Sequence, residues 1–593
     1  MAVMHDLDWL FAIGTIFFCL SVWGIGANDI ANSYATSVSS RTLSLIQAGM
    51  LATITEFVGA IALGQGVTET VRSGVFSIDR FKDSPGVMIM AMVVAEFGSS
   101  IWLTVCTYFG FPVSTTQSII GALVGVGIAA DLQVKWSWSK NSVSQIVASW
   151  GVAPLIAAGF SAFIFLTIRL LVHSRADPLK WALRVLPFYY AITAGILSLF
   201  IVISGGHGIP SLEEMGAGKA CGIIIGVFAG VWFVSAVFFL PYYYKKLVKE
   251  DRRLRFWHIP MGPLLWKENY TLYFPGNPEN AVVPDYYQSD LKELSQSSTE
   301  QLTTGQQHAG EAGKIEKNQK DNIDPATAAD AETDRRRQGE LAALDKYAWA
   351  HPKRILLTLK FLFTYGVTRD VIHHQSRGLE EIHKRAPVFD NKVEHLWTTA
   401  QVCSAMIMSV AHGGNDVSNA IGPFTTEYMT WRSGKTMAKT ATPIWIKAVG
   451  GIGLGIGEYR NTSPSHRHYC LIVPSHVHSI NFKFISGFWT FGYHIMRSLG
   501  NRITKHSPTR GYSMELGAAI TVLIATQYGL PVSTTQCITG AIVGVALVNY
   551  DFKSINWKQL AYIFLGWVLT LPSAGLISGI IMGMALNVPQ WGS

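Results

Sequence analysis

The chain has 593 residues, of which 49% are hydrophobic and only 15% are charged, and its mean hydropathy is +0.27. This composition excludes a single soluble domain and indicates a membrane protein. The formal net charge of +8 is best explained by basic residues beside membrane segments, so we predict contact with a lipid bilayer and no binding of nucleic acid.

Apolar stretches long enough to span about 30 Å of hydrocarbon recur along the chain. The first has no Ala-x-Ala-like cleavage site and carries Asn28-Asp29 at its end, so we predict a retained helix rather than a signal peptide. The pattern predicts an all-α polytopic membrane protein with about twelve transmembrane or re-entrant helical segments. These lie near residues 8–27, 44–67, 87–109, 113–131, 143–172, 187–204, 219–243, 396–423, 442–498 (interrupted), 513–529, 532–549 and 558–586.

Two polar motifs occur once in each half of the chain. GANDIAN at 26–32 matches GGNDVSN at 413–419, and a second block aligns without a gap between 96–127 and 515–546. The second block repeats Gly-x-Pro-Val-Ser-Thr-Thr-Gln. A packing face of small residues would explain one copy of either motif but explains two ordered copies poorly. The chain is therefore predicted to contain an internal duplication.

The orientation of the two copies follows from charge. Basic residues crowd against the end of the seventh segment at Lys245, Lys246, Lys249, Arg252, Arg253 and Arg255. The positive-inside rule places the connection that follows in the cytoplasm, so both termini are expected outside. An odd number of crossings separates the first helices of the two copies, which makes them inverted repeats. Re-entrant hairpins would each remove an even number of crossings and leave this parity unchanged.

The sequence predicts three parts. Residues 1–243 form an N-terminal membrane half, 244–395 a cytoplasmic loop and 396–593 a C-terminal membrane half. The loop is expected to be disordered around 288–339, where aromatic residues are almost absent. Within the loop, 355–367 is hydrophobic but too short to cross, so a helix lying on the membrane surface is expected. A cytoplasmic regulator of the loop and a homo-oligomer both stay open.

Acidic residues inside membrane segments mark ion paths or paired charges, because a buried ionised carboxylate costs several kcal/mol. The candidates are Asp29, Glu56, Glu96, Asp416 and Glu515. The two aspartates recur in one motif beside four asparagines, Asn28, Asn32, Asn415 and Asn419. Residues four apart share a helix face, so Asn28 and Asn32 are expected to point together. Carboxylate and amide oxygens suit a hard cation such as sodium. A polar network that only holds helices together is the alternative.

The repeated Pro-Val-Ser-Thr-Thr-Gln sequences suggest complementary chemistry. Pro112 and Pro531 interrupt a helix, and hydroxyl residues follow at the start of the next one. These residues are Ser114, Thr115, Thr116, Ser533, Thr534 and Thr535, with Gln117 and Gln536 one position further on. Hydroxyls and free backbone N–H groups at a helix N-terminus can bind an anion. Ordinary capping explains one such residue better than three in succession, twice. Two opposed hairpins meeting near the midplane would surround an oxyanion, with sodium offsetting its charge.

These paired motifs resemble the signatures of the inorganic phosphate transporter family, and the glutamine after Ser-Thr-Thr resembles its fungal sodium–phosphate symporters. The resemblance covers about 1–240 and 396–593. It implies phosphate contacts from Asp29, Ser114, Thr115, Thr116, Asp416, Ser533, Thr534 and Thr535. It implies sodium contacts from Asn28, Asn32, Glu96, Asn415, Asn419 and Glu515. Coupling or gating roles are expected for Glu56, Gln117 and Gln536.

We therefore expect a secondary active symporter of the plasma membrane that imports inorganic phosphate with sodium by alternating access. No GxxxxGK[ST] motif occurs, so direct use of ATP has no support, and no cofactor besides the coupling ion is expected. A proton-coupled carrier of phosphate or another oxyanion and a transport-inactive phosphate sensor are the alternatives. An enzyme is not expected, because a hydrolase needs a nucleophile with a general base and no histidine accompanies either Ser-Thr-Thr sequence.

The second half is too long for a simple duplication. Asn28 and Glu96 are 68 positions apart, whereas Asn415 and Glu515 are 100 apart, and the 32 extra residues fall around the polar stretch 458–485. Its four histidines, His466, His468, His476 and His478, could ligate zinc. A loop between two short helices is another reading, but the leading hypothesis is a translated intron or gene-model error. A transcript that keeps these codons in every spliced copy would contradict it.

Overall fold

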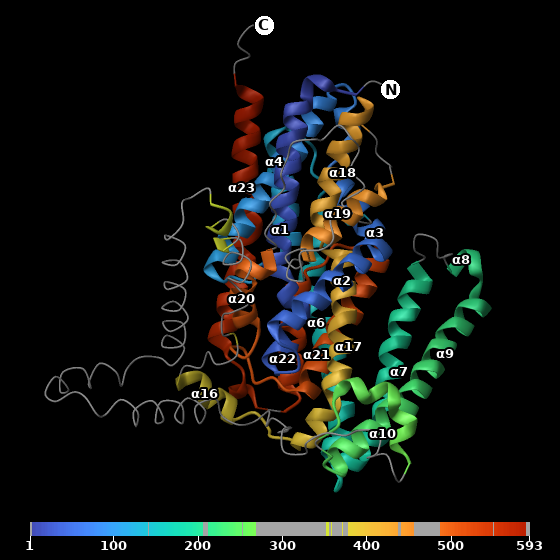
Figure 1. The fold of residues 1–593 in the computed structure, drawn as a ribbon. Coiled ribbons are helices and arrows are strands. Elements are labelled where there is room, and N and C mark those ends of the chain that lie inside the picture. The colour runs from blue at the N-terminus through green and yellow to red at the C-terminus, as the bar shows by residue number, and fades with distance from the viewer. Residues whose placement is uncertain are drawn as a thin grey trace, which may run out of the picture.

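The structure is a computed structural model. It describes residues 3–139, 142–204, 212–251, 253–267, 351–354, 357–358, 371, 377–436, 441–455, 487–549 and 551–588. Every regular element in these ranges is a helix, which confirms the all-α class (Figure 1). The predicted disordered stretch 288–339, the stretch 458–485 and almost all of the predicted surface helix at 355–367 lie outside the described residues.

Both halves are built from helices that differ widely in length. The first half contains α1 (Asp8–Ser39), α2 (Leu45–Leu63), α3 (Gln65–Ser73), α4 (Pro85–Phe109), α5 (Thr115–Ala129), α6 (Val143–Ile168, continued by a π-helical turn to His173), α7 (Pro178–Ser204), α8 (Leu212–Met215), α9 (Ala217–Val234) and α10 (Leu240–Tyr243). The short α11 (Gly262–Leu265) and α16 (Arg377–Lys384) lie in the central connection. The second half contains α17 (Asn391–Asn415), α18 (Ser418–Ser433), α19 (Ile444–Gly455), α20 (Gly487–Leu499), α21 (Pro508–Gln527), α22 (Thr534–Leu547) and α23 (Trp557–Asn587).

Seven helical stretches in the described part are long and apolar enough to cross a membrane, which makes this a multi-pass membrane protein. They contain α1, α2, α4, α6, α7, α9 and α23. α5 and α22 are apolar but have only 15 and 14 residues. At 1.5 Å per residue each is about 22 Å long, too short to cross about 30 Å of hydrocarbon. Two of the predicted apolar segments are therefore half-length helices.

The Asn-Asp pairs differ in their helical setting. α1 continues to Ser39, so the prediction that Asn28-Asp29 stands at a helix end is wrong. Their polarity lowers the hydropathy there, but both side chains are buried in hydrogen-bonded surroundings and the helix runs through them. In the second half, α17 ends at Asn415 and α18 begins at Ser418, so the predicted segment 396–423 is two helices.

The two motif helices run in opposite directions. The Met4 amide at the start of α1 donates to the Trp431 carbonyl near the end of α18 at 2.9 Å. At the other end of α1, Ser40 Oγ donates to Gln401 Oε1 of α17 at 2.9 Å. In Figure 1, α1 accordingly runs downwards from the N-terminus while α17 and α18 run upwards. The arrangement is that of inverted repeats, as the crossing parity predicts.

Each Pro-Val-Ser-Thr-Thr-Gln sequence follows a glycine that ends the preceding helix. Gly110 after α4 and Gly529 after α21 have φ of 73° and 68°, a left-handed conformation that glycine adopts without steric cost. Proline two residues later keeps the helix from resuming at once. The chain reverses, and α5 and α22 begin in the protein interior. We call residues 112–117 the first tip and 531–536 the second tip.

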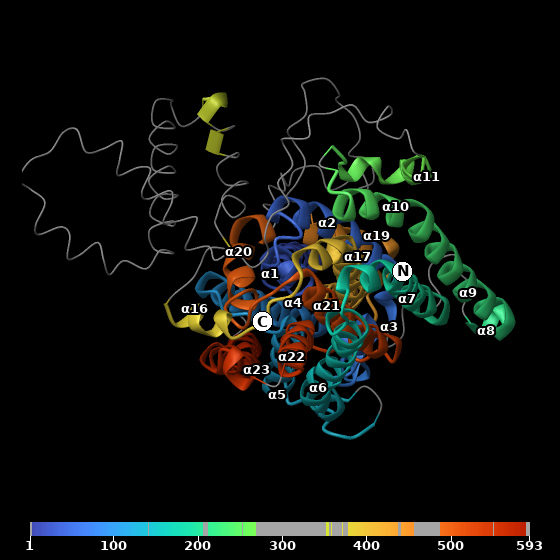
Figure 2. The ribbon, with the colours of Figure 1, turned by 90° about the horizontal axis from the view of Figure 1, so that it is seen from below.

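Glycines at equivalent positions of the two halves allow the half-length helices α5 and α22 to pack closely against long helices. A Cβ on Gly121 of α5 would lie 2.5 Å from the Leu571 carbonyl oxygen of α23, and Gly540 of α22 is as tightly packed against the Pro154 carbonyl of α6. Such small residues allow close approach of membrane helices. Seen from below, α5, α6, α22 and α23 lie together on one side of the bundle, whereas α8 and α9 reach away from it (Figure 2).

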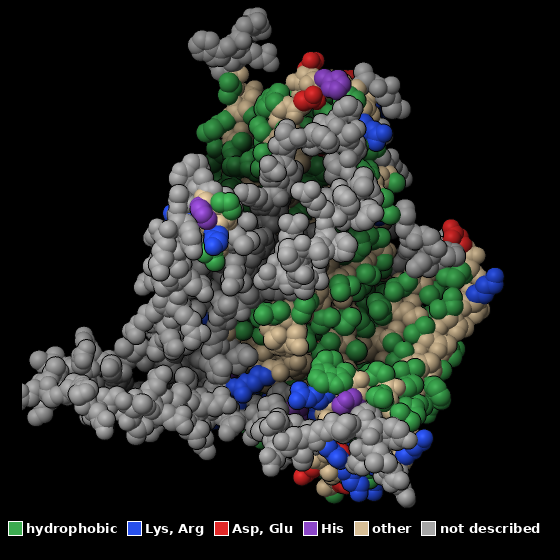
Figure 3. Space-filling view, in the orientation of Figure 1, with side chains coloured by type: hydrophobic (Ala, Val, Ile, Leu, Met, Phe, Trp, Pro, Cys, Tyr) green, Lys and Arg blue, Asp and Glu red, His purple; other side chains and the backbone are tan. Residues whose placement is uncertain are grey.

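Basic side chains gather at one end of the described surface. Figure 3 shows hydrophobic side chains over the middle of the molecule and most of the visible lysine and arginine side chains at its lower end. The start of α17 reaches this end, where Lys392 Nζ lies 2.6 Å from Glu250 Oε1. The beginning and the end of the central connection therefore lie close together.

Two buried histidines at this end predict sensitivity to acid, His383 in the last turn of α16 and His506 in the connection between α20 and α21. His383 Nε2 lies 2.7 Å from the Asn501 carbonyl oxygen. Burial lowers the pKa of His383 to about 4 and that of His506 to about 3. Because the unfolded chain takes up these protons near pH 6.5, their stabilising effect is complete above that pH and is lost as the pH falls towards 4.

We expect the melting temperature of the purified protein to drop between pH 7 and pH 5. His383 alone should lower the free energy of unfolding by up to about 2 kcal/mol over this range. The His383→Gln variant keeps a donor for Asn501 but has no titratable ring, so its melting temperature should change less with pH. An unchanged pH dependence in this variant, measured by differential scanning fluorimetry, would refute the assignment.

Candidate functional site

The two tips meet in the interior through reciprocal contacts. Thr116 Oγ1 donates to the Val532 carbonyl oxygen at 3.2 Å, and Thr535 Oγ1 donates to the Val113 carbonyl oxygen at 3.2 Å. The same contact is thus made twice with the halves exchanged. The N-termini of α5 and α22 lie at the centre of an approximate twofold arrangement.

Each motif helix contacts the tip of the opposite half. Asn32 Nδ2 donates to Thr534 Oγ1 at 3.0 Å and to Thr535 Oγ1 at 2.9 Å. Asn419 Nδ2 donates to Thr115 Oγ1 at 3.1 Å and to Thr116 Oγ1 at 3.0 Å. The two halves therefore build the centre jointly.

The first asparagine of each motif instead holds the hairpin of its own half. Asn28 Oδ1 accepts from the Val113 amide at 3.1 Å, and the Asn415 amide group lies 3.1 Å from Thr526 Oγ1. Asn28 and Asn32 share a helix face as expected but serve different tips. The reason is that both tips converge on the same stretch of α1.

Both aspartates accept hydrogen bonds from the opposite tip. Thr535 Oγ1 donates to Asp29 Oδ1 at 3.2 Å, and Thr116 Oγ1 donates to Asp416 Oδ1 at 3.1 Å. Thr534 also donates to Asp416. Both carboxylates are buried, with 1% of the residue exposed in each case. The centre thus combines two carboxylates with a ring of hydroxyl groups.

Capping accounts for the serines of the tips. Ser114 Oγ accepts from the Gln117 amide at 3.2 Å, and Ser533 Oγ accepts from the Gln536 amide at 3.3 Å. The threonines that follow are not caps, because their hydroxyls face the motif helices. Two helix N-termini, each carrying partial positive charge and N–H groups without intrahelical partners, converge beside them. This arrangement can bind an anion.

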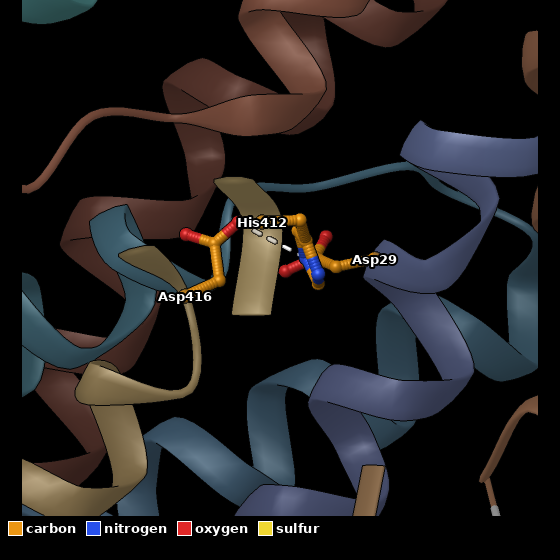
Figure 4. A group of neighbouring side chains, drawn as sticks. All are labelled: Asp29, His412 and Asp416. Atoms are coloured by element: carbon orange, nitrogen blue, oxygen red, sulfur yellow. Dashed lines mark ion pairs between the residues drawn. The ribbon is translucent and has the colours of Figure 1, made fainter. Parts of the chain in front are cut away.

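His412 joins the aspartates and was missed by the sequence analysis. Its Nδ1 lies 2.7 Å from Glu56 Oε2 and its Nε2 lies 3.1 Å from Asp416 Oδ2. Ligand atoms of Asp29, His412 and Asp416 all lie within 4.8 Å of one another (Figure 4). Comparison of the repeats pairs position 412 with Ile25, so His412 left no duplicated signal.

No histidine lies near either tip in the sequence, but in the folded chain His412 contacts Asp416, the aspartate to which Thr534 donates. The expectation that no histidine accompanies the tips is therefore wrong for the folded protein. Both ring nitrogens of His412 face carboxylates rather than a serine hydroxyl. A serine nucleophile activated by this histidine has no support.

Two of the predicted glutamates have full sets of partners. Glu56 accepts from Ser409 Oγ at 2.7 Å in addition to its contact with His412. Glu515 accepts from residues of α1 and α17, which are Thr36 (2.5 Å), Ser37 (2.6 Å), Ser404 (2.6 Å) and Gln401 (3.2 Å). Glu515 therefore lies beside the last turn of α1, and its role as a sodium ligand stays a prediction.

Glu96, which matches Glu515, has a different environment. Within the described residues neither of its carboxylate oxygens has a hydrogen-bond partner, and the same is true of Glu427 in α18. When the two halves are aligned on their Asn-Asp motifs, Gly14 of the first half stands at the position of Gln401 in the second half. The first half therefore lacks an amide donor at this position, and the Glu427 carboxylate occupies the space beside Gly14. Glu427 also lacked a duplicated signal and was missed.

The contact between Gly14 and Glu427 predicts that the stability lost on replacing Gly14 depends on whether Glu427 is present. A methyl group at Gly14 would collide with the Glu427 carboxylate, the end of a flexible side chain that has to shift, so Gly14→Ala should lower the stability by about 1 kcal/mol. In a Glu427→Ala background the same change should be nearly neutral. Gly151→Ala, where a Cβ meets nothing within 4 Å, is the matched control. Equal losses of melting temperature in both backgrounds would show that the collision is not the cause.

Buried amide oxygens in matched positions are left without partners. The four atoms are Asn32 Oδ1, Asn419 Oδ1, Gln117 Oε1 and Gln536 Oε1, and none has a hydrogen-bond partner within the described part of the chain. Amide oxygens can only accept, so a cation satisfies them where no donor is available. The pairs follow the same twofold relation as the tips. They are therefore candidate ligands for sodium.

Comparisons with known proteins agree with this arrangement. Residues 25–578 match the Phosphate transporter family. The chain is 37% identical to the phosphate-repressible phosphate permease pho-4 of Neurospora crassa, covering 100% of this chain and 99% of that protein. It is 27% identical to sodium-dependent phosphate transporter 1 of Rattus norvegicus, covering 98% and 96%.

A solved structure titled "The sodium-dependent phosphate transporter" shares the fold, with a TM-score of 0.63 at 20% identity and coverage of 98% of this chain and 100% of that chain. These findings confirm the resemblance drawn from the repeated motifs, and the family is one of transporters rather than enzymes. The chain belongs to the phosphate transporter family.

Proposed function

We propose that this protein is a secondary active symporter that imports inorganic phosphate together with sodium by alternating access. The observation that carries the proposal is the meeting of two hydroxyl-rich helix N-termini beside two aspartates, with four buried amide oxygens that have no donor among the described residues. One set of groups suits an oxyanion and the other a hard cation. The names of the similar proteins, a phosphate permease and sodium-dependent phosphate transporters, support the same pairing.

Phosphate would bind between the tips. Its contacts are proposed to be Asp29, Ser114, Thr115, Thr116, Asp416, Ser533, Thr534 and Thr535. Backbone N–H groups and hydroxyls can donate to its unprotonated oxygens, while a protonated oxygen can donate to a carboxylate. Two ionised aspartates would otherwise repel the anion. Binding is therefore expected to require cations nearby, which links phosphate to sodium.

Sodium would bind at both sides of the phosphate. The proposed ligands are Asn28, Asn32, Glu96, Asn415, Asn419 and Glu515. The unpartnered oxygens favour Asn32 and Asn419 among these, and they add Gln117 and Gln536 as candidates. Glu56 would act on coupling through His412 and Asp416. Each positive charge moved inwards gains about 2.3 kcal/mol per 100 mV, so more than one sodium per monovalent phosphate would make uptake voltage-driven.

The proposed setting is the plasma membrane, with both termini outside and the connection of 244–395 in the cytoplasm. Lysine and arginine side chains at the end where this connection starts support the orientation. The contacts between each motif helix and the tip of the opposite half, which join residues 1–243 to 396–593, would break and form again as the site opens alternately to each side.

Uptake of radiolabelled phosphate into proteoliposomes, with sodium and proton gradients imposed separately, tests the proposal. We expect uptake with an inward sodium gradient and little with a proton gradient alone. Uptake that follows the proton gradient would favour the proton-coupled alternative. Phosphate binding without flux under either gradient would favour a transport-inactive sensor.

A further inference from the structure

Glu96 and Glu515 stand at equivalent positions of the two halves, but their surroundings differ in every side-chain donor. Glu515 accepts from four side chains, Thr36, Ser37, Gln401 and Ser404. The Asn-Asp motifs relate α1 to α17 and α18 with an offset of 387 positions. This offset pairs the four donors with Pro423, Phe424, Gly14 and Phe17. None of these four side chains can donate a hydrogen bond, so Glu96 faces a space built without donors.

A second carboxylate takes the place of these donors. The Glu427 carboxylate of α18 occupies the space beside Gly14. Gln401, the equivalent of Gly14, donates to Glu515, so the approximate twofold relation turns Glu96 towards the space that Glu427 occupies. Both glutamates are 0% exposed, and none of their four carboxylate oxygens has a hydrogen-bond partner in the described part of the chain. Two buried carboxylates thus meet where the second half has one carboxylate and an amide.

Apolar side chains enclose this space on both sides along α1, α4 and α18, which pack against one another. The two apolar layers contain Leu10, Ile89 and Trp431 on one side and Phe18, Leu103 and Phe424 on the other. Gly14 lies four positions from a member of each layer, Glu96 seven positions, and Glu427 three and four positions. Residues at these spacings share a helix face. The two carboxylates therefore lie in one polar layer between two apolar layers.

We propose that Glu96 and Glu427 together bind one sodium ion, in a site separate from the tips. Ionised carboxylates that are buried without donors need a positive charge beside them, and carboxylate oxygens are ligands that hard cations prefer. The choice of sodium rests on the proposed function.

The position of the site follows from α1. Gly14 precedes Asp29 by 15 residues in this continuous helix, which corresponds to about 22 Å along its axis. A sodium ion beside Gly14 is therefore too far from the tips to contact phosphate there. The site lies towards the end of the bundle that carries the N-terminus (Figure 1), the end proposed to face outside, so external sodium would fill it.

Equilibrium binding of radiolabelled sodium to the purified full-length chain, without phosphate, tests this inference. The number of ions bound at saturation should fall by one in Glu96→Gln and by one in Glu427→Gln. The double variant should also lose only one ion, because both carboxylates bind the same ion. Glu381→Gln, which replaces an exposed glutamate of α16, should bind as many ions as the wild type.

Thermal unfolding provides a second measurement on the same proteins. In Glu427→Gln the new amide can donate to Glu96, as Gln401 donates to Glu515, so this variant should fold without sodium. Replacing potassium with sodium should raise the melting temperature of the wild type more than that of Glu427→Gln. An equal rise in both proteins would count against a sodium ion at this glutamate.

An unchanged number of bound ions in Glu427→Gln would overturn the inference, and so would a loss of two ions in the double variant. If the two carboxyl groups hold protons instead, all these proteins should bind the same number of sodium ions. Failure of the proposed function is a separate result. A chain that takes up no phosphate could still lose one ion in these variants, whereas sodium-driven uptake with an unchanged ion number in Glu427→Gln would reject this site alone.

Discussion

Replacing Asp29 or Asp416 with asparagine should lower sodium-driven phosphate uptake about 10- to 100-fold, the range expected when a hydrogen bond to a charged group worth about 1.5–3 kcal/mol is lost. Each carboxylate accepts from a threonine of the opposite tip and lies in the group shared with His412. Asparagine keeps the size of the side chain but removes the negative charge that would balance sodium. The measurement is the initial rate of uptake per transporter at the cell surface.

Asp79→Asn provides the matched control, because Asp79 is exposed and pairs only with Lys82 in the residues described around it. Its uptake should equal that of the wild type. Near-normal uptake by Asp29→Asn or by Asp416→Asn, at an equal surface level, would count directly against the role given to that aspartate. A loss that merely follows a loss of surface protein would point to folding instead.

Replacing His412 with leucine should destabilise the protein and abolish most of its uptake. The change leaves the Glu56 carboxylate, which is fully buried, without its imidazole partner, and breaking a buried pair in this way costs about 3–5 kcal/mol. Thermal unfolding of the purified protein measures the first effect, and uptake per surface transporter measures the second.

Adding Glu56→Gln to the leucine variant separates the two effects. The double variant has no unpaired charge at position 56, so its melting temperature should recover part of the loss. Its uptake should stay low, because Asp416 has still lost the imidazole 3.1 Å away. A leucine variant as stable as the wild type, or a double variant with restored uptake, would contradict this account of His412.

Repetition in the sequence explains which parts of the site could be predicted. Asn32 and Asn419, the aspartates and the tip threonines are each duplicated, and the structure brings all of them together. His412 and Glu427 are not duplicated, so a comparison of the halves gives no reason to select them. The exchange of contacts between halves was also beyond the sequence, since it depends on how the hairpins pack.

Hydropathy predicted the membrane helices better than it predicted their ends. The first predicted apolar segment ended near residue 27, because polar residues follow, yet α1 runs to Ser39. Asn28 and Asn32 are tolerated there because their amide groups donate to the Phe111 carbonyl oxygen and to Thr534 Oγ1. A hydropathy scale scores a polar side chain as if it faced lipid, and it takes no account of hydrogen-bond partners inside the protein. The sequence left open whether the segments that begin at the tips cross the membrane or re-enter it, and the half length of α5 and α22 agrees with re-entry.

The central claim is that the two tips form one site in which sodium and phosphate bind together. Equilibrium binding of radiolabelled phosphate to the purified chain, with and without sodium, tests it most directly in the wild type and in the Thr116→Val/Thr535→Val variant. These valines keep the shape of threonine but remove the hydroxyls that donate to both aspartates. The account predicts that sodium raises the affinity for phosphate and that the variant loses at least about tenfold of it. Phosphate binding that is independent of sodium, or that is unchanged in the variant, would contradict it.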